Sequence, residues 1–244
     1  MNHPGPARSL TRYDRFLRKR DAASGGANAA RLRHRYDVIF SRNRDLFEGA
    51  RVLDIMSSTG FWSLAALDAG AAHVVGVEPS PAPIEAAQKS FSEYGVNPGS
   101  YRFIKSEAPA ALRSFDPQAF DVVLSHGFLE LSDARFFFQQ ISRLKPKYVI
   151  LDTRTVIGKG PIVRLKTRSA DETRSKAAAR DNPILAVPNQ ELITFFCDYF
   201  QLRARPIDWK SAGIADWSSV SDYEQGRRQT FILERMVANA QRAR

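Results

Sequence analysis

The chain has 244 residues, of which 43% are hydrophobic and 25% charged, so it can form one large α/β domain with a sizeable core. Its single cysteine, Cys197, excludes an intrachain disulfide and indicates a reducing compartment. No apolar run approaches the ~18 residues of a membrane span, and the amino end lacks the apolar core of a signal peptide, so we expect a cytoplasmic protein. The formal charge of +10 predicts attraction to anions without choosing among nucleic acid, acidic small molecules and anionic lipid.

Residues 1–47 are predicted to form a basic helical segment ahead of the main domain. Apolar residues recur at helical spacing over 9–20, and the glycine-containing stretch 22–27 is a candidate hinge. A second helix is predicted over about 28–47. Its apolar stripe consists of Leu32, Tyr36, Ile39 and Phe40. The first helix is interpreted either as a lid over a binding site or as packing on the sheet, and packing is favoured for the second.

A strand, a turn of small residues and a helix start follow one another at Arg51–Phe61. The strand contains Asp54, and a second predicted strand ends about 20 residues later at Glu78. Such a turn lets a ligand approach the backbone, the helix amino end favours an anionic group, and the distal acid accepts hydrogen bonds from ribose hydroxyls. The pattern therefore predicts a site for an adenine nucleoside.

Strands and helices alternate from residue 51 to residue 152. The predicted strands are 51–55, 73–78, 101–105, 120–125 and 147–152, and the predicted helices lie near 61–70, 81–94, 107–114 and 133–143. Alternation of this kind predicts a doubly wound, mostly parallel sheet with helices on both faces. The carboxyl ends of its strands form one edge, where ligands bind.

The pattern breaks after Asp152. Residues 153–187 are rich in Arg, Lys, Thr and Ala and are interpreted as an insertion into a main domain that spans 48–244. A helix is predicted to resume near Asn189, a plausible cap, and to carry Leu192, Phe195, Phe196 and Tyr199 inward. Closing strands at about 201–208 and 229–235 bring the sheet to seven.

Four segments resemble class I S-adenosylmethionine-dependent methyltransferases in the expected order. Val52–Gly60 resembles the first motif, and the segments 103–108, 120–126 and 144–152 resemble the third, fourth and fifth strands with their flanks. The resemblance implies the Rossmann-like fold of that family and S-adenosyl-L-methionine as cofactor. Met56 and Ser58 depart from it, because they stand where the family has glycine and only Gly60 remains. Two alternatives follow: a shifted but working cofactor loop, or a fold that has lost cofactor affinity.

The resemblance also implies a set of cofactor-binding residues. Asp54 would steady the loop and the methionine ammonium group, Glu78 would bind the ribose hydroxyls, and Glu107 with Ala108 would lie beside the adenine. The full set is Asp54, Ser57, Ser58, Gly60, Glu78, Pro79, Glu107, Ala108 and Ser125. For Glu107, a plain acid at a helix amino end is the alternative.

His126 follows the fourth predicted strand, at the position that faces the methyl acceptor in this family. A histidine takes up a proton near neutral pH, so His126 is the candidate general base, with a backbone hydrogen-bonding role as the alternative. Asp152 is interpreted as a structural strand-end acid or as a ligand for substrate or metal. One cysteine and four dispersed histidines give no zinc spacing, so no metal is expected.

Three functions remain open on the sequence. The first is methyl transfer to a small metabolite, whose anionic character is left open. The second is an RNA methyltransferase, since the 57–61 turn is similar to hemolysin-like ribosomal RNA 2′-O-methyltransferases and the basic charge suits phosphate; His126 in place of that group's aspartate argues against it. The third is a non-catalytic binding subunit, suggested by Met56. The oligomeric state is not indicated.

Overall fold

A computed structural model describes residues 27–167 and 184–236. The helix predicted at 9–20 and nearly all of the hinge at 22–27 lie outside the described residues. Among the described helices, none combines the length and the apolar character needed to cross a bilayer.

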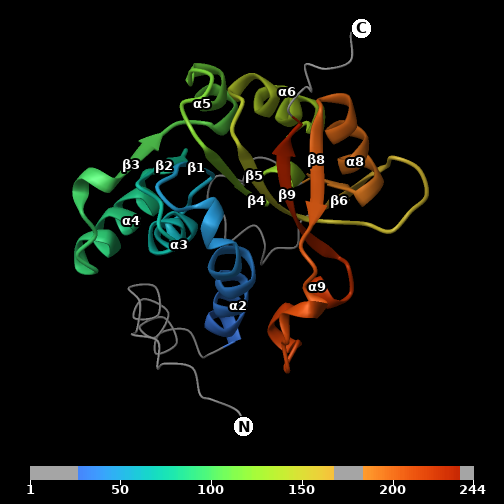
Figure 1. Cartoon of the computed structure of the whole chain (residues 1–244), viewed down its shortest axis with the longest axis horizontal. Coiled ribbons are helices and arrows are strands. Elements are labelled where there is room, and N and C mark those ends of the chain that lie inside the picture. Colours follow the sequence, from blue (N-terminus) through green and yellow to red (C-terminus); the bar gives the residue numbers. More distant parts are fainter. Residues whose placement is uncertain (1–26, 168–183, 237–244) are drawn as a thin grey trace, which may run out of the picture.

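A seven-stranded sheet forms the centre of the molecule, with the strand order β3-β2-β1-β4-β5-β9-β8 (Figure 1). The strands are β1 (Arg51–Ile55), β2 (His73–Glu78), β3 (Tyr101–Lys105), β4 (Val122–His126), β5 (Tyr148–Arg154), β8 (Leu202–Pro206) and β9 (Arg228–Arg235). The first five are parallel, whereas β9 pairs antiparallel with both β5 and β8. This confirms the predicted doubly wound, mostly parallel sheet and places the carboxyl ends of β1, β2, β4 and β5 along one edge.

Helices cover both faces of the sheet, each over its own hydrophobic cluster. One face carries α3 (Phe61–Asp68) and α4 (Pro81–Glu93), and the other carries α5 (Ala108–Ser114), α6 (Ala134–Leu144) and α8 (Gln190–Tyr199). Shorter elements are η3 (Pro98–Ser100), η4 (Leu129–Leu131), η6 (Lys210–Ala212), η7 (Ser218–Val220) and α9 (Ser221–Glu224). Successive side chains of a strand point to opposite faces of the sheet. Polar residues at every second position near the strand ends therefore point toward the face that carries α3.

The amino-terminal element is less regular than the single helix predicted over 28–47. It consists of α2 (Ala27–Arg35), a wide π-helical turn η1 (Tyr36–Phe40) and a 3₁₀ segment η2 (Ser41–Leu46). The break has a local cause: Asn43 leaves the helical region, and its side-chain amide donates to the carbonyls of Val38 and Ile39. The predicted apolar stripe is nevertheless buried in the α3-side cluster, so this segment packs on the sheet as expected.

The predicted insertion at 153–187 contains a two-stranded antiparallel hairpin, β6 (Val163–Thr167) with β7 (Ile184–Pro188). Helix α8 then begins after Asn189, whose side chain accepts from the amide of Leu192 and so caps the helix as predicted. The prediction that Phe195 and Tyr199 point inward was wrong, since they are 51% and 72% exposed. The buried stripe is instead Ile193 and Cys197, one helical turn apart, with Phe196 packed beside them.

Candidate active site

The turn after β1 adopts left-handed backbone conformation at three alternating positions. Met56, Ser58 and Gly60 have φ values of 57°, 50° and 75°. A left-handed conformation costs a residue with a Cβ roughly 1–2 kcal/mol, so the first two positions are strained. The Met56 side chain packs against the cluster on the α5 face, whereas Ser58 is exposed. The loop therefore keeps the backbone of an alternating-glycine turn although two of the glycines are replaced.

Glu78 ties this turn to the end of β2. Its two carboxylate oxygens accept from the backbone amides of Ser58, at 3.0 Å, and of Ser80, at 3.1 Å. The residue is only 3% exposed, and burial raises the pKa of its carboxyl above the usual range. Each carboxylate oxygen has a further lone pair, so Glu78 retains the capacity to accept from ribose hydroxyls.

Asp54 lies in β1 beneath the same turn and is 1% exposed. The Ser63 hydroxyl donates to its Oδ2 at 2.6 Å, while burial raises the pKa of the Asp54 carboxyl to about 7. Within the described part of the chain, Oδ1 of Asp54 and the buried Oγ of Ser57 have no hydrogen-bond partner. Buried acceptors normally find a donor, so the pair fits the ammonium end of S-adenosylmethionine.

The remaining predicted cofactor residues lie at three different places. Pro79 is half-buried directly after Glu78. Glu107 is exposed at the N-cap of α5 without a side-chain capping bond, and its charge contributes to the raised pKa of Glu78, so the two acids are close enough to interact. Ala108 is buried in the α5-side cluster. Ser125 is fully buried and, by strand alternation, points to the face opposite Asp54.

His126 ends β4, in register with Asp152 on β5. Its ring stacks on Trp62 with centroids 4.8 Å apart, and on Phe40 at 6.0 Å. The Nη2 of Arg35 lies 3.2 Å from Nδ1 of His126. Because a guanidinium only donates, Nδ1 must be the acceptor in this contact, and a neutral ring then carries its proton on Nε2.

Asp152 is fully buried at the end of β5 and is surrounded by donors. Its Oδ1 accepts from Arg35 at 2.9 Å and from Arg228 at 2.6 Å, and its Oδ2 accepts from Tyr223 at 2.6 Å and Thr230 at 2.8 Å. Burial alone would raise its pKa, but the two guanidinium groups hold it well below the usual range. Protein donors thus occupy both carboxylate oxygens of Asp152. Of its two interpretations, this favours the structural one.

The arginines around Asp152 were not predicted from the sequence. Arg31 and Arg35 lie one turn apart on α2, and Arg31 forms a bidentate pair with Asp222, both oxygens at 2.7 Å. Arg35 also lies over the Trp62 ring, 4.4 Å from its centroid. The i, i+4 spacing of the two arginines was visible in the sequence, but their carboxylate partners, Asp152 and Asp222, are more than 100 residues away. Among the described residues, no group of three His, Cys, Asp or Glu side chains is arranged to hold a metal ion.

Comparison with known proteins supports a methyltransferase architecture. A family described as "Methyltransferase domain" matches residues 52–147. A 1,6-didemethyltoxoflavin-N1-methyltransferase of Burkholderia thailandensis, solved with its substrate and S-adenosylhomocysteine, is 14% identical with a TM-score of 0.57; the match covers 96% of this chain and 94% of that one. The YcgJ protein of Bacillus subtilis is 15% identical with a TM-score of 0.56, over 82% of this chain and 98% of that one. At these identities the likeness shows the fold.

A methyltransferase of Mesorhizobium loti that depends on S-adenosylmethionine is also similar, with 11% identity and a TM-score of 0.56 over 80% of this chain and 96% of that one. No curated protein sequence matches the chain. The match at residues 52–147 spans β1 to the loop before β5, and so includes Asp54, the strained turn, Glu78 and His126.

Proposed function

We propose that the chain is a class I S-adenosylmethionine-dependent methyltransferase, as the match at residues 52–147 supports, and that it methylates a small, anionic metabolite. S-Adenosylmethionine supplies an activated methyl group, so the protein has to bind, align and, where needed, deprotonate the acceptor. We assign Asp54, Ser57, Ser58, Gly60, Glu78, Pro79, Glu107, Ala108 and Ser125 to cofactor binding and His126 to the acceptor side.

The observation that carries the anionic acceptor is the charge of the cluster around His126. Arg35 and Arg228 both donate to Oδ1 of the buried Asp152, so two guanidinium groups share one carboxylate oxygen beside His126. Arg35 contributes the cation nearest the His126 ring, and its side chain is 11% exposed. A largely buried guanidinium that shares its carboxylate with a second arginine can also donate to a ligand that brings a negative charge.

The aromatic surroundings of the same residues favour a planar or apolar acceptor body. Trp62 stacks on His126 and lies under Arg35, and Phe40 stacks on both rings. Aromatic side chains beside a small number of placed polar groups are typical of small-molecule sites. An acceptor with one acidic group and an apolar ring matches both features.

The Arg35 contact also defines how His126 can act. While Arg35 donates to Nδ1, the neutral ring offers an N–H at Nε2 and can orient the acceptor by donating to it. If the acidic group of the acceptor takes over the guanidinium, the Nδ1 lone pair is released and can accept a proton. In this proposal Arg35 couples recognition of the anion to the activation of His126 as a base.

The test is transfer of a labelled methyl group from S-adenosylmethionine into fractionated cell extract. We expect label in molecules below about 1 kDa that anion exchange retains, and loss of that label with Arg35→Gln under conditions where cofactor binding is unchanged. Label only in neutral or cationic small molecules would contradict the anionic acceptor.

RNA is the second candidate acceptor. The β6–β7 hairpin exposes every residue of β6, including Arg164 and Lys166, and the whole chain carries a formal charge of +10. Exposed basic residues favour phosphate contacts. Ribonuclease-sensitive label, together with RNA binding that falls steeply with salt, would replace the small-molecule proposal.

A further inference from the structure

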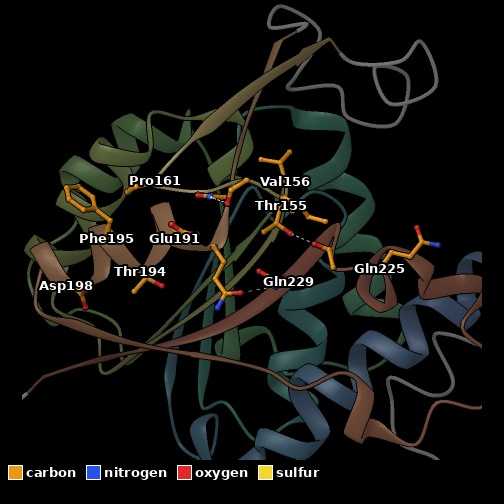
Figure 2. A pocket seen from close by; sticks show the side chains of 14 residues that line it. Thr155, Val156, Pro161, Glu191, Thr194, Phe195, Asp198, Gln225 and Gln229 are labelled. Atoms are coloured by element: carbon orange, nitrogen blue, oxygen red, sulfur yellow. Dashed lines mark hydrogen bonds between the residues drawn. The ribbon is translucent and has the colours of Figure 1, made fainter.

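A cavity of about 690 Å³ opens on the other face of the sheet (Figure 2). Its walls are the chain after β5, the exposed face of α8 and the turn that leads into β9. The lining residues used below are Ile157, Glu191, Phe195, Asp198 and Gln229. The volume lies within the range of small-molecule sites, about 300–1,000 Å³.

The charge of this cavity is opposite to that of the chain. Among the residues that the structure describes, its lining includes two carboxylates, Glu191 and Asp198, and no Lys, Arg or His, although the protein carries a formal charge of +10. The two acids lie two helical turns apart on α8, so they share one face of the helix, and Figure 2 shows both beside the cavity. Such a lining attracts a cation and disfavours an anion.

Apolar side chains accompany the two acids. Phe195 lies between them in the sequence of α8 and is 51% exposed, and Ile157 on the facing loop is 84% exposed. An exposed aromatic ring next to carboxylates offers its face to an apolar body or to a cation. Phe195 faces away from the α8-side core, contrary to the sequence prediction. Its ring thereby forms part of the cavity wall.

A third feature is an acceptor without a donor. The side-chain amide of Gln229 donates to Oε1 of Gln190 at 3.3 Å, whereas the buried Oε1 of Gln229 has no hydrogen-bond partner within the described part of the chain. Gln229 lines the cavity. A ligand that carries an N–H group would satisfy this oxygen.

We propose that this cavity is a second ligand site, separate from the cofactor site, and that it binds a protonated primary or secondary amine on an apolar body. Glu191 and Asp198 balance the charge, Gln229 accepts an N–H, and Phe195 with Ile157 packs on the apolar part. The site lies on the α8 face, whereas Arg35 and His126 lie on the α3 face. It therefore does not depend on the nature of the methyl acceptor.

The test is a titration of the full chain with phenethylamine at pH 7, monitored in ¹H–¹⁵N NMR spectra. Phenylacetate is the anionic probe of similar size. We expect saturable shifts that include the Gln229 side-chain amide with the amine and none with the acid. Glu191→Gln and Asp198→Asn should each weaken binding about fivefold, as for an exposed ion pair. Glu85→Gln, an exposed acid on α4, is the matched control and should leave binding unchanged.

Gln229→Leu separates the hydrogen bond from the charge. We expect about tenfold weaker amine binding, with a thermal unfolding profile that confirms a folded chain and with unchanged affinity for S-adenosylhomocysteine. Equal binding of amine and acid, or equal amine binding by wild type and the Glu191→Gln/Asp198→Asn double variant, would overturn the proposal. Loss of S-adenosylhomocysteine binding in the folded Gln229→Leu variant would contradict a site separate from the cofactor site.

Discussion

Nη2 of Arg35 lies 2.9 Å from Oδ1 of Asp152, and this ion pair joins the amino-terminal helical segment to the end of β5. Asp152 is the centre of the cluster, because it also accepts from Arg228, Tyr223 and Thr230. The two partners are therefore unequal: Asp152 keeps three donors without Arg35, but without Asp152 two cations face each other.

Asp152→Asn should lower the free energy of unfolding by about 3–5 kcal/mol, because it leaves the largely buried guanidinium of Arg35 without its carboxylate and removes the shortest of the three ion pairs of Arg228. Arg35→Gln should cost less, about 1–2 kcal/mol, since the buried Asp152 carboxylate keeps three of its four donors. Urea denaturation measures both. The control is Arg203→Gln, which breaks an exposed 3.6 Å pair with Glu234 and should change little. A cost for Asp152→Asn no larger than for Arg35→Gln would contradict this account.

Glu78→Ala should weaken binding of S-adenosylmethionine by about 1–3 kcal/mol, through loss of the hydrogen bonds to ribose and of the brace on the turn. Glu78 accepts from the amides of Ser58 and Ser80, so the substitution also loosens the backbone that contacts the ligand. Calorimetry measures the affinity, and Glu85→Ala on α4 is the control. Unchanged affinity would remove Glu78 from the cofactor site.

The raised pKa of Asp54, about 7, predicts a pH dependence with a defined sign. An aspartate in the unfolded chain titrates near pH 3.9. Between about pH 4 and pH 7 the native state therefore holds a proton on Asp54 that the unfolded state has lost, and the free energy of unfolding falls as the pH rises through this window. The lost contribution is on the order of 4 kcal/mol for about three pH units. Asp54→Asn lacks this group, so its stability relative to wild type should rise over the same window, as unfolding by urea at several pH values would show.

The same titration should appear in cofactor binding. An ionised Asp54 attracts the ammonium group, so affinity for S-adenosylmethionine should increase from pH 5.5 to 7.5 in wild type and stay flatter in Asp54→Asn. Parallel profiles for the two proteins would show that Asp54 does not face the cofactor.

Gly60→Ala should destabilise the protein more than Gly95→Ala. Both glycines have positive φ, 75° and 62°, so both substitutions pay a similar backbone cost. A Cβ at Gly60 would also lie 3.0 Å from the rings of Phe91 and Phe103, whereas nothing lies within 4 Å of one at Gly95. We expect an additional 1–3 kcal/mol or so for Gly60→Ala from overpacking, measured by thermal or urea unfolding. Equal effects would mean that the aromatic rings move aside at no cost.

His126→Asn should reduce turnover by about 10²–10⁴-fold if the ring transfers a proton, with little change in cofactor affinity. The matched control is His73→Asn, at the opposite end of the parallel strands. Turnover at the wild-type rate would leave His126 with only a packing role beside Trp62 and Phe40.

The sheet could be predicted because its strands are short apolar runs with turn residues on both sides, and all five predicted parallel strands lie within two residues of the observed ones. The break in the amino-terminal helix could not, because Asn43 is compatible with a helix until its side chain finds two backbone carbonyls. The predicted orientation of α8 was wrong because it assumed that the aromatic residues are buried. The residues that pack against the sheet are instead Ile193 and Cys197.

The cofactor-side acids lie at the predicted strand ends because strand position is a local property of the sequence. The arginine cluster is non-local: Arg35, Asp152 and Arg228 are brought together by three separate parts of the chain, and no spacing connects them. Scattered arginines resembled surface charge, and only the tertiary fold shows that Arg228 is largely buried.

Arg228 and Gln229 are neighbours in β9, yet one reaches Asp152 and the other lines the cavity of opposite polarity. Deleting or adding one residue in the preceding turn would shift the register of β9 by one residue, so that each of its side chains would point to the opposite face of the sheet. A guanidinium would then enter the acidic cavity and an amide would face Asp152, so a single-codon length change there would damage both regions at once. This short loop should accept substitutions far more readily than insertions or deletions.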